Sequence, residues 1–346
     1  MTRLYARKKG MQAAVLISGL LAASFGQALP AMAASGATVP RAAVPALHKM
    51  ATIALGSTSN IFKNIFTQAP DGAVFFSRGS VVYVQKGTAA PQVALHASRS
   101  VLALAASTSR LFVQTGLTVT EYNRAGGAKV RQWTLTSPVT PITIAGLLVV
   151  GQTLWSWTDW GTDSSGFEFA RLSRINITAA AVHVVDKQAY PVDVAANSSG
   201  AFFEDARGTR GVGNLVHVTP SGGVHARRGP VEALLALAGG RLDQMLFHAD
   251  GHQYIDTYGE ASLARLSSAR ISDNDRMFAG TGLGLIVLNE PCQHLVCAKA
   301  NVSKLAANGS RTGTVTVPNA FSVLTGKNGA VVTVTGGHMF LVRIAS

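Results

Sequence analysis

Residues 72–85 read GAVFFSRGSVVYVQ, two short apolar runs on either side of an Arg-Gly-Ser turn. The same pattern returns at residues 110–123 (RLFVQTGLTVTEYN) and at residues 329–344 (GAVVTVTGGHMFLVRI). Runs rich in Val, Phe and Thr around a glycine turn are typical of β-hairpins. Because no stretch of the chain shows a sustained helical period, the sequence predicts an all-β protein.

Weaker copies of this hairpin extend the pattern along the chain. They begin near Gly146, Gly200, Gly240 and Gly284, so the seven starts lie 38, 36, 54, 40, 44 and 45 residues apart. A period near 40 residues that contains about four strands is typical of a β-propeller blade. Short apolar runs that precede the copies would supply the inner strands: Val101–Ala106, Pro141–Ala145, Val192–Ala196, Val231–Leu237, Arg276–Ala279 and Phe321–Leu324.

The last of the seven predicted blades lacks one strand, because the sequence ends at Ser346 after three. We expect residues Met50–Leu55 (MATIAL) to complete it as the outer strand, which closes the ring and removes exposed sheet edges. The predicted fold class is therefore an all-β propeller of seven four-stranded blades, a single domain over residues 50–346. A pair of β-sandwiches or a β-helix is the alternative, but either would produce this spacing less naturally.

With this architecture the chain resembles the bacterial secreted seven-bladed β-propellers of the broad WD-repeat-like and quinoprotein-like superfamily. The resemblance covers nearly all of the chain after residue 49 and rests on architecture alone. The sequence has no Gly-His/Trp-Asp signature, tryptophan-docking repeat, Asp-box or haem C-x-x-C-H motif. The resemblance therefore implies a fold but no catalytic residues.

The N-terminus predicts export. Residues 1–33 have the three parts of a cleaved signal peptide: a basic start, an apolar stretch and an A-x-A box that ends at Ala33. A transmembrane anchor is the alternative, but polar residues and glycines dilute the run, and no other segment is long and apolar enough to span a bilayer. We expect a secreted, periplasmic or cell-envelope protein in which residues 34–49 form a flexible leader.

The charge balance predicts an anionic partner. The chain has 30 Lys and Arg against 17 Asp and Glu, a net charge of +13 that becomes +9 without the four bases of the signal peptide. Such an imbalance favours attraction to an anionic partner, such as a cell-wall polymer, lipid headgroups or an anionic polysaccharide, or adaptation to an acidic medium. The bases are scattered rather than concentrated in a stripe with aromatic residues, which argues against nucleic acid.

The two cysteines, Cys292 and Cys297, are predicted to form a disulfide across a short loop, since an exported protein meets an oxidising environment. A redox-active or metal-binding pair is the alternative. Such pairs commonly have C-x-x-C spacing, and this spacing is longer.

The connections between the second and third strands of all blades emerge on one face of a propeller. The sequence makes these connections longest in blades 3 to 6, and loops held by a rigid scaffold are where binding residues concentrate. The candidate binding residues are Trp155, Trp157, Trp160, Glu204, Arg207, Arg210, His248, His252 and His294. Exposed tryptophans suit sugar stacking or a protein contact, although they also pack long loops onto a scaffold.

Two groups of residues on the same face are candidates for a metal ion. His248, Asp250 and His252 surround a tight turn, and Asp159 and Asp163 supply oxygen ligands of the kind that calcium prefers. The polarity of turns explains both groups without a metal. No cofactor is predicted, because the sequence contains neither a phosphate-binding loop nor a serine-nucleophile motif.

These features together predict an exported, non-catalytic propeller that binds a cell-envelope protein or polysaccharide through one loop-decorated face. The alternative is a propeller hydrolase, lyase or lactonase with a metal near the central channel. Such an enzyme needs carboxylates or histidines that converge from several blades. A third possibility is a purely structural or assembly role.

Overall fold

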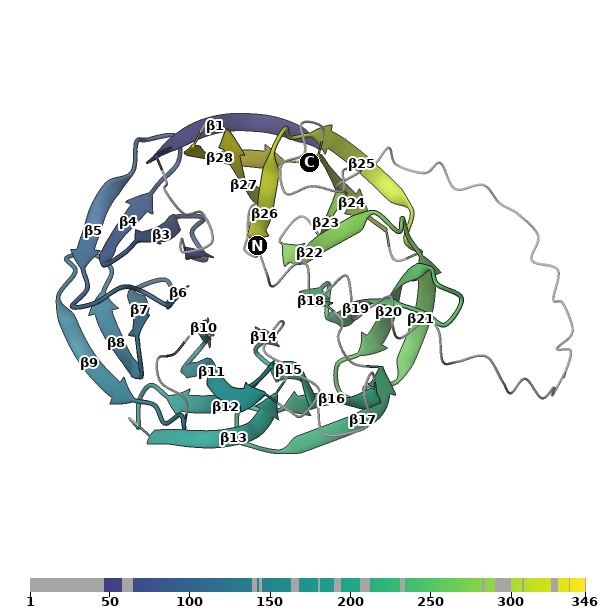
Figure 1. The fold of residues 1–346 in the computed structure, drawn as a ribbon, viewed down its shortest axis with the longest axis horizontal. Coiled ribbons are helices and arrows are strands. Elements are labelled where there is room, and N and C mark those ends of the chain that lie inside the picture. Colours follow the sequence, from purple (N-terminus) through teal and green to yellow (C-terminus); the bar gives the residue numbers. More distant parts are fainter. Residues whose placement is uncertain are drawn as a thin grey trace, which may run out of the picture.

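The chain forms a ring of antiparallel β-sheets around a central axis (Figure 1). The computed structural model describes residues 47–57, 65–138, 142, 145–162, 168–179, 181–189, 194–205, 212–230, 234–281, 284–289, 300–306, 308–324, 329–335 and 337–345. All 28 elements within these residues are β-strands, arranged as seven four-stranded blades. The predicted all-β fold class and the seven-bladed propeller are therefore confirmed. None of the described residues belongs to a helix that could cross a membrane.

The strands of each blade follow one another from the centre of the ring outward (Figure 1). Blade 1 contains β2 (Phe66–Gln68), β3 (Val74–Arg78), β4 (Val81–Gln85) and β5 (Gln92–His96). Blade 2 contains β6 (Ala103–Ala106), β7 (Arg110–Thr115), β8 (Thr118–Asn123) and β9 (Lys129–Thr134). Blade 3 contains β10 (Ala145–Val150), β11 (Thr153–Thr162), β12 (Glu168–Asn176) and β13 (Ala181–Ala189).

The next three blades repeat this order. Blade 4 contains β14 (Ala195–Asn197), β15 (Gly200–Asp205), β16 (Val212–Val218) and β17 (Val224–Pro230). Blade 5 contains β18 (Leu234–Ala238), β19 (Arg241–Phe247), β20 (Gln253–Gly259) and β21 (Arg265–Arg270). Blade 6 contains β22 (Asp275–Thr281), β23 (Gly284–Asn289), β24 (Asn301–Leu305) and β25 (Arg311–Thr316). A single bridge between Ala189 and Asp205 links blades 3 and 4.

Blade 7 combines strands from the two ends of the described chain. Its inner strands are β26 (Ala320–Leu324), β27 (Gly329–Thr335) and β28 (His338–Ala345). The outer strand is β1 (His48–Ser57), which pairs antiparallel with β28 (Figure 1). Ile53 and Leu55 of β1 contribute to an apolar cluster with Leu341 of β28, so both hydrogen bonding and apolar burial hold this strand in the blade.

The predicted register of blade 3 is wrong by one strand. Gly146 does not start the second strand of the blade; it lies in the inner strand β10, and the second strand is β11. The turn at Gly151, which has a φ of 56°, joins these two strands. Because the residues on both sides of this turn are apolar, the sequence pattern fits either assignment.

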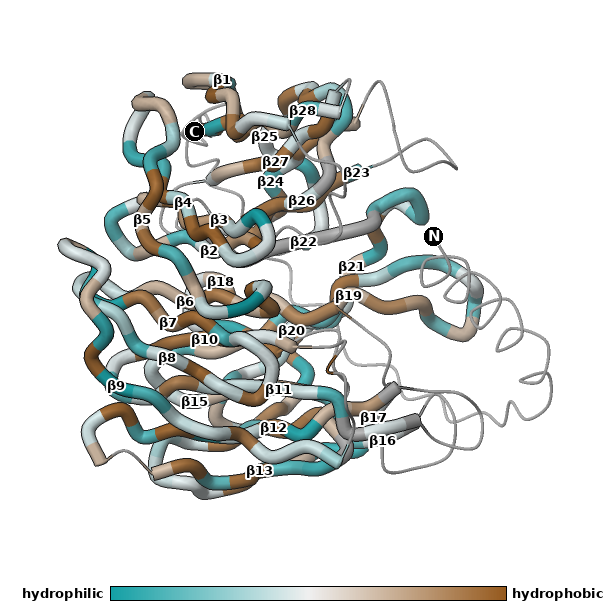
Figure 2. Tube along the Cα trace, turned by 60° about the vertical axis from the view of Figure 1, so that its left-hand side comes forward, coloured by the Kyte–Doolittle hydropathy of each residue, from teal (hydrophilic) through white to brown (hydrophobic). Residues whose placement is uncertain are grey.

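The second strand of a blade packs against the neighbouring blades with both of its faces. In β7, Leu111 contacts the cluster shared with blade 1, Phe112 contacts the cluster shared with blade 3, and each is at most 1% exposed. A strand covered on both faces has an apolar run in place of the polar–apolar alternation of a surface strand. Hydrophobic colour accordingly follows the strands, whereas many turns are hydrophilic (Figure 2).

Candidate functional site

The sequence predicts that the binding residues lie on one face of the ring, which we call the loop face. It carries the connections between the second and third strands, such as residues 248–252 in blade 5, and the links between successive blades. The other face, which we call the turn face, carries the remaining hairpins, such as residues 239–240.

The tryptophans of blade 3 do not form the expected binding loop. Trp155 and Trp157 lie within strand β11, and Trp155 is fully buried in the apolar cluster between blades 3 and 4. Trp157 packs against the same cluster and covers Gly146, where an added Cβ would lie 1.9 Å from the indole ring. The assignment of Trp155 to a ligand-binding surface is therefore corrected, since no face of its indole is open to a ligand. The side chain of Trp160 lies outside the described residues.

The turn in blade 5 holds the two predicted histidines apart from one another. The backbone N–H of His248 donates to the carbonyl of His252, which closes the hairpin. Although the two backbones are hydrogen-bonded, the His248 side chain has partners other than His252. Its ring stacks on Tyr254, with 4.1 Å between ring centroids, and its Nε2 lies 3.2 Å from Asp256. Asp250 accepts hydrogen bonds from the Tyr254 hydroxyl (2.7 Å) and from the His252 backbone N–H (3.0 Å).

His252 points to the end of the outer strand. Its Nδ1 lies 3.0 Å from Oδ2 of Asp273 and 2.7 Å from Nη2 of Arg270. A protonated Nδ1 donates to the carboxylate, whereas an unprotonated Nδ1 accepts from the guanidinium. The backbone N–H of Gln253 is the main cause that lowers the pKa of Asp273, with the His252 hydrogen bond next. Each histidine therefore has its own carboxylate partner, and this hairpin lies away from the central channel.

The predicted metal ligands are not brought together. In the described part of the chain, no group of three or more His, Cys, Asp or Glu side chains is placed to hold a metal ion. Asp159 is buried at 5% exposure, and the Tyr254 hydroxyl is the main cause that lowers the pKa of Asp250.

Six further predicted residues lie outside the described residues: Asp163, Arg207, Arg210, Cys292, His294 and Cys297.

Glu204, a predicted binding residue, belongs to a buried polar network between blades 4 and 5. Nε2 of Gln244 donates to Glu204 at 2.8 Å, and the Tyr258 hydroxyl donates to Oε1 of Gln244 at 3.0 Å. Burial, with a further contribution from Asp256, raises the pKa of Tyr258 to about 12, so the hydroxyl stays a donor at physiological pH. Glu204 is 1% exposed; it stabilises the junction of the two blades and offers no charge to a ligand.

Acidic and basic residues differ in how often they are buried. Eight of the 12 acids whose burial the structure describes are buried, namely Glu121, Asp159, Asp186, Glu204, Asp205, Asp243, Asp256 and Asp275. No Lys or Arg is buried in the part of the chain that the structure describes. Asp256, for example, accepts from Ser268 at 2.5 Å and from Arg265 at 3.2 Å. Carboxylates are therefore scarcer on the described surface than the composition alone indicates, whereas the net charge is unchanged by burial.

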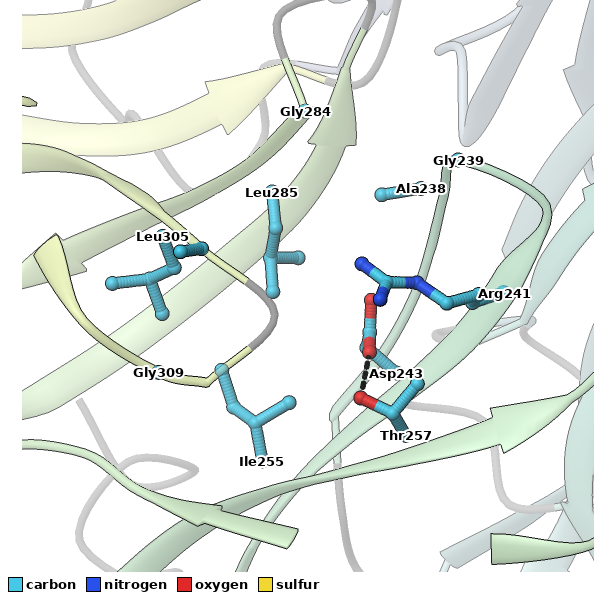
Figure 3. A pocket seen from close by; sticks show the side chains of 11 residues that line it. Ala238, Gly239, Arg241, Asp243, Ile255, Thr257, Gly284, Leu285, Leu305 and Gly309 are labelled. Atoms are coloured by element: carbon cyan, nitrogen blue, oxygen red, sulfur yellow. Dashed lines mark hydrogen bonds between the residues drawn. The ribbon is translucent and has the colours of Figure 1, made fainter. Parts of the chain in front are cut away.

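A pocket on the turn face was not predicted from the sequence. It lies between blades 5 and 6, and Asp243 and Arg241 of β19 border it (Figure 3). Asp243 is 1% exposed and accepts one hydrogen bond, from the Thr257 hydroxyl at 2.6 Å. Burial raises the pKa of Asp243, although the Thr257 hydrogen bond and the Arg241 charge oppose that rise. The only sequence signal was an acid within the apolar run of β19 (RLDQMLF).

Comparison with known proteins supports the architecture. No protein-family model and no curated protein sequence matches the chain. Among solved structures, it is similar to the WD40 domain of Toxoplasma gondii coronin, with 10% identity, a TM-score of 0.53 and coverage of 87% of each chain. It is also similar to a chain of the Mitotic Checkpoint Complex, with 11% identity, a TM-score of 0.57 and coverage of 92% of this chain and 100% of that one. The chain is thus a seven-bladed β-propeller with WD40-like architecture.

Proposed function

We propose that this chain is an exported, non-catalytic propeller that binds an anionic envelope protein or polysaccharide through its loop face. The observation that carries the proposal is the unequal burial of charge: eight acids are buried, whereas no described Lys or Arg is. The net positive charge attracts anions and raises association rates, and burial leaves few carboxylates on the surface to repel a bound anion at close range.

The loop face offers exposed bases for this contact. Arg99 lies in the link between blades 1 and 2, Arg270 ends β21, and Arg228 lies near the end of β17 that leads to this face; all three are exposed. The shared chemistry of the proposed partners is negative charge, with carboxylates from an acidic protein surface or from a polysaccharide.

Binding to two anionic probes tests the proposal. Poly-L-glutamate represents an acidic polypeptide, heparin represents an anionic polysaccharide, and dextran is the uncharged control. We expect binding to at least one anionic probe that weakens as salt is added, and none to dextran. The double variant Arg228→Glu with Arg270→Glu should weaken that binding by about tenfold or more.

A charge-matched variant on the turn face separates a specific face from general attraction. Lys86 and Lys129 are exposed and lie near turn-face hairpins. Lys86→Glu with Lys129→Glu changes the net charge equally and should weaken binding by less than about threefold. Equal losses for the two double variants, or no binding to either anionic probe, would overturn the proposal.

A further inference from the structure

Asp243 occupies a position that other blades fill with a large apolar side chain. It lies on the second strand, pairs with Ala236 of the inner strand, and faces the next blade. The equivalent residues in blades 1, 2, 3, 4 and 6 are Phe75, Phe112, Trp155, Phe202 and Ile286. Each of the five is at most 2% exposed and packs in a cluster shared with the next blade.

Blade 7 follows the same rule, since the two residues of β27 that pack toward blade 1, Ala330 and Val332, are apolar and fully buried. The packing of blades therefore does not require a carboxylate at this position. A buried charge that the fold does not need lowers stability, and such groups concentrate at functional sites.

The Asp243 carboxylate is only half satisfied by the protein. Its Oδ1 accepts from Thr257, whereas its buried Oδ2 has no hydrogen-bond partner among the residues that the structure describes. Nearly all buried polar groups in native proteins are hydrogen-bonded to protein or to water, so an unpaired carboxylate oxygen at the edge of a pocket is a candidate contact for a bound donor. That partner must be a hydrogen-bond donor, and a cationic donor would satisfy the charge as well.

The pocket beside Oδ2 has apolar walls and a narrow polar side. Ile255 of blade 5 and Leu285 and Leu305 of blade 6 lie across from Asp243 (Figure 3). The glycines Gly239, Gly284 and Gly309 border the pocket, and no atom lies within 4 Å of the place where a Cβ of Gly239 would be. The cavity volume is about 130 Å³, close to that of a cavity that holds a molecule of the size of benzene, and the pocket is also open to solvent.

The charge of Arg241 restricts which charged groups a ligand in this pocket can carry. Its side chain lies on the same wall as Asp243, and its charge lowers the pKa of Asp243 without supplying a hydrogen bond to Oδ2. A simple cation would be repelled by Arg241, and a simple anion would be repelled by Asp243. A molecule with one ammonium and one carboxylate satisfies both residues and leaves the site neutral.

We propose that the pocket between blades 5 and 6 binds a free aliphatic α-amino acid. The ammonium donates to Oδ2 of Asp243, the carboxylate accepts from Arg241, and the aliphatic side chain contacts Leu285 and Leu305. This site is on the turn face, so it is separate from the anion-binding surface proposed above.

Calorimetric titration with L-leucine and two of its analogues tests the site. 3-Methylbutylamine keeps the ammonium and the aliphatic body, and 4-methylpentanoate keeps the carboxylate and the aliphatic body. L-Leucine should bind the purified chain at least about tenfold more tightly than either analogue, because each analogue leaves either Asp243 or Arg241 without a charged partner. Asp243→Asn and Arg241→Gln should each weaken L-leucine binding by about tenfold or more.

Lys86→Glu is the control, since it alters an exposed base away from the pocket and should leave L-leucine binding unchanged. Thermal unfolding of each variant shows whether it is folded, and the isosteric Asp243→Asn keeps the shape of the site. Failure of L-leucine to bind, equal binding of 3-methylbutylamine, or unchanged binding by Asp243→Asn would each overturn the proposal. Heparin or polyglutamate binding is measured on the same samples and should be unaffected by Asp243→Asn, so the two proposals fail independently.

Discussion

Trp155 and Asp243 occupy equivalent positions at two junctions of the ring, and their chemistry is opposite. Trp155 fills the junction of blades 3 and 4 and is fully buried among apolar side chains. Asp243 is buried to the same degree at the junction of blades 5 and 6, but it borders a pocket and keeps one oxygen unpaired. The propeller therefore tolerates a functional group at a junction because each junction is a separate cluster, and six others hold the ring.

The junction of blades 4 and 5 shows that burial of a carboxylate is not by itself a sign of function. Glu204 there is as buried as Asp243, but Gln244 donates to it, and Tyr258 in turn donates to Gln244. A connected polar network of this kind makes the blade interface more specific, whereas an unsatisfied oxygen lowers stability. The distinguishing feature of Asp243 is the absence of a partner for Oδ2, not its burial.

The largest change in stability is expected when the Trp155 side chain is removed from the apolar junction of blades 3 and 4. Trp155→Ala removes a fully buried indole and should lower the free energy of unfolding by about 3–5 kcal/mol. Thermal unfolding should show a midpoint lower by roughly 10 °C. Lys86→Glu, at an exposed position, should change the midpoint little. An unchanged midpoint for Trp155→Ala would contradict the burial of the indole.

A gain in stability is expected when Asp243 is replaced by an apolar residue like those at the equivalent position of the other blades. Asp243→Leu removes a buried, half-satisfied carboxylate and adds apolar contact with Leu285, so it should stabilise the chain by about 1–2 kcal/mol. The thermal midpoint should rise by roughly 3 °C, while the proposed L-leucine binding is lost. A lower midpoint would show that Asp243 has a structural role that the pocket does not explain.

Thr257 supplies the one hydrogen bond to Asp243 and should be coupled to it. Thr257→Val should lower the free energy of unfolding by about 1 kcal/mol in the natural sequence, because the carboxylate loses its donor. The same change in an Asp243→Leu background should cost little. A double-mutant cycle from chemical denaturation measures the difference; additive effects would mean that the 2.6 Å hydrogen bond contributes nothing to stability.

The smallest effect is expected in the pH dependence of the free energy of unfolding, and its sign follows from the pKa of Asp243. Burial raises the folded-state pKa of Asp243 above its ordinary value of 3.8, so the folded chain holds this proton more tightly than the unfolded chain does. The ionised carboxylate therefore destabilises the fold at neutral pH, and this cost is relieved as the pH falls from the folded pKa to about 3.8.

The matching measurement is the difference in thermal midpoint between Asp243→Asn and the natural chain. It should be greatest at neutral pH, shrink as the pH falls through the folded pKa, and stay constant below the ordinary value. All other titrating groups are common to the two proteins and cancel. A difference that does not depend on pH would show that Asp243 titrates normally.

The repeats in the sequence predicted the strands and the number of blades, but not every register. The starts at Gly72, Arg110 and Gly329 were clear because a glycine turn separates two apolar runs. In blade 3 the residues around Gly151 are apolar on both sides, because a strand buried on both faces loses the alternation that would identify it. The sequence pattern consequently places the second strand one strand too early and assigns Trp155 to a loop.

The candidate sites were likewise predictable from the sequence only in part. The histidine hairpin of blade 5 could be located from its Ala-Asp-Gly turn, and the structure places it on the predicted face. The partners of His248 and His252 could not be predicted, because Asp256 and Asp273 come from the third strand and from the link to the next blade. Asp243 was overlooked, since an acid within a strand is unremarkable until its counterparts in other blades are aligned by strand pairing.

The repeated pattern alone predicts seven similar β units, because short strands and glycine turns are local features whose spacing can be read without knowledge of packing. The sequence also supports the prediction of export, which rests on the first 33 residues alone. Which side chains lie at the junctions between blades depends on the tertiary structure, because those contacts join residues of different repeats. Packing placed Trp155 in the core, buried eight acids, and left one oxygen of Asp243 without a partner among the described residues, at the edge of a pocket.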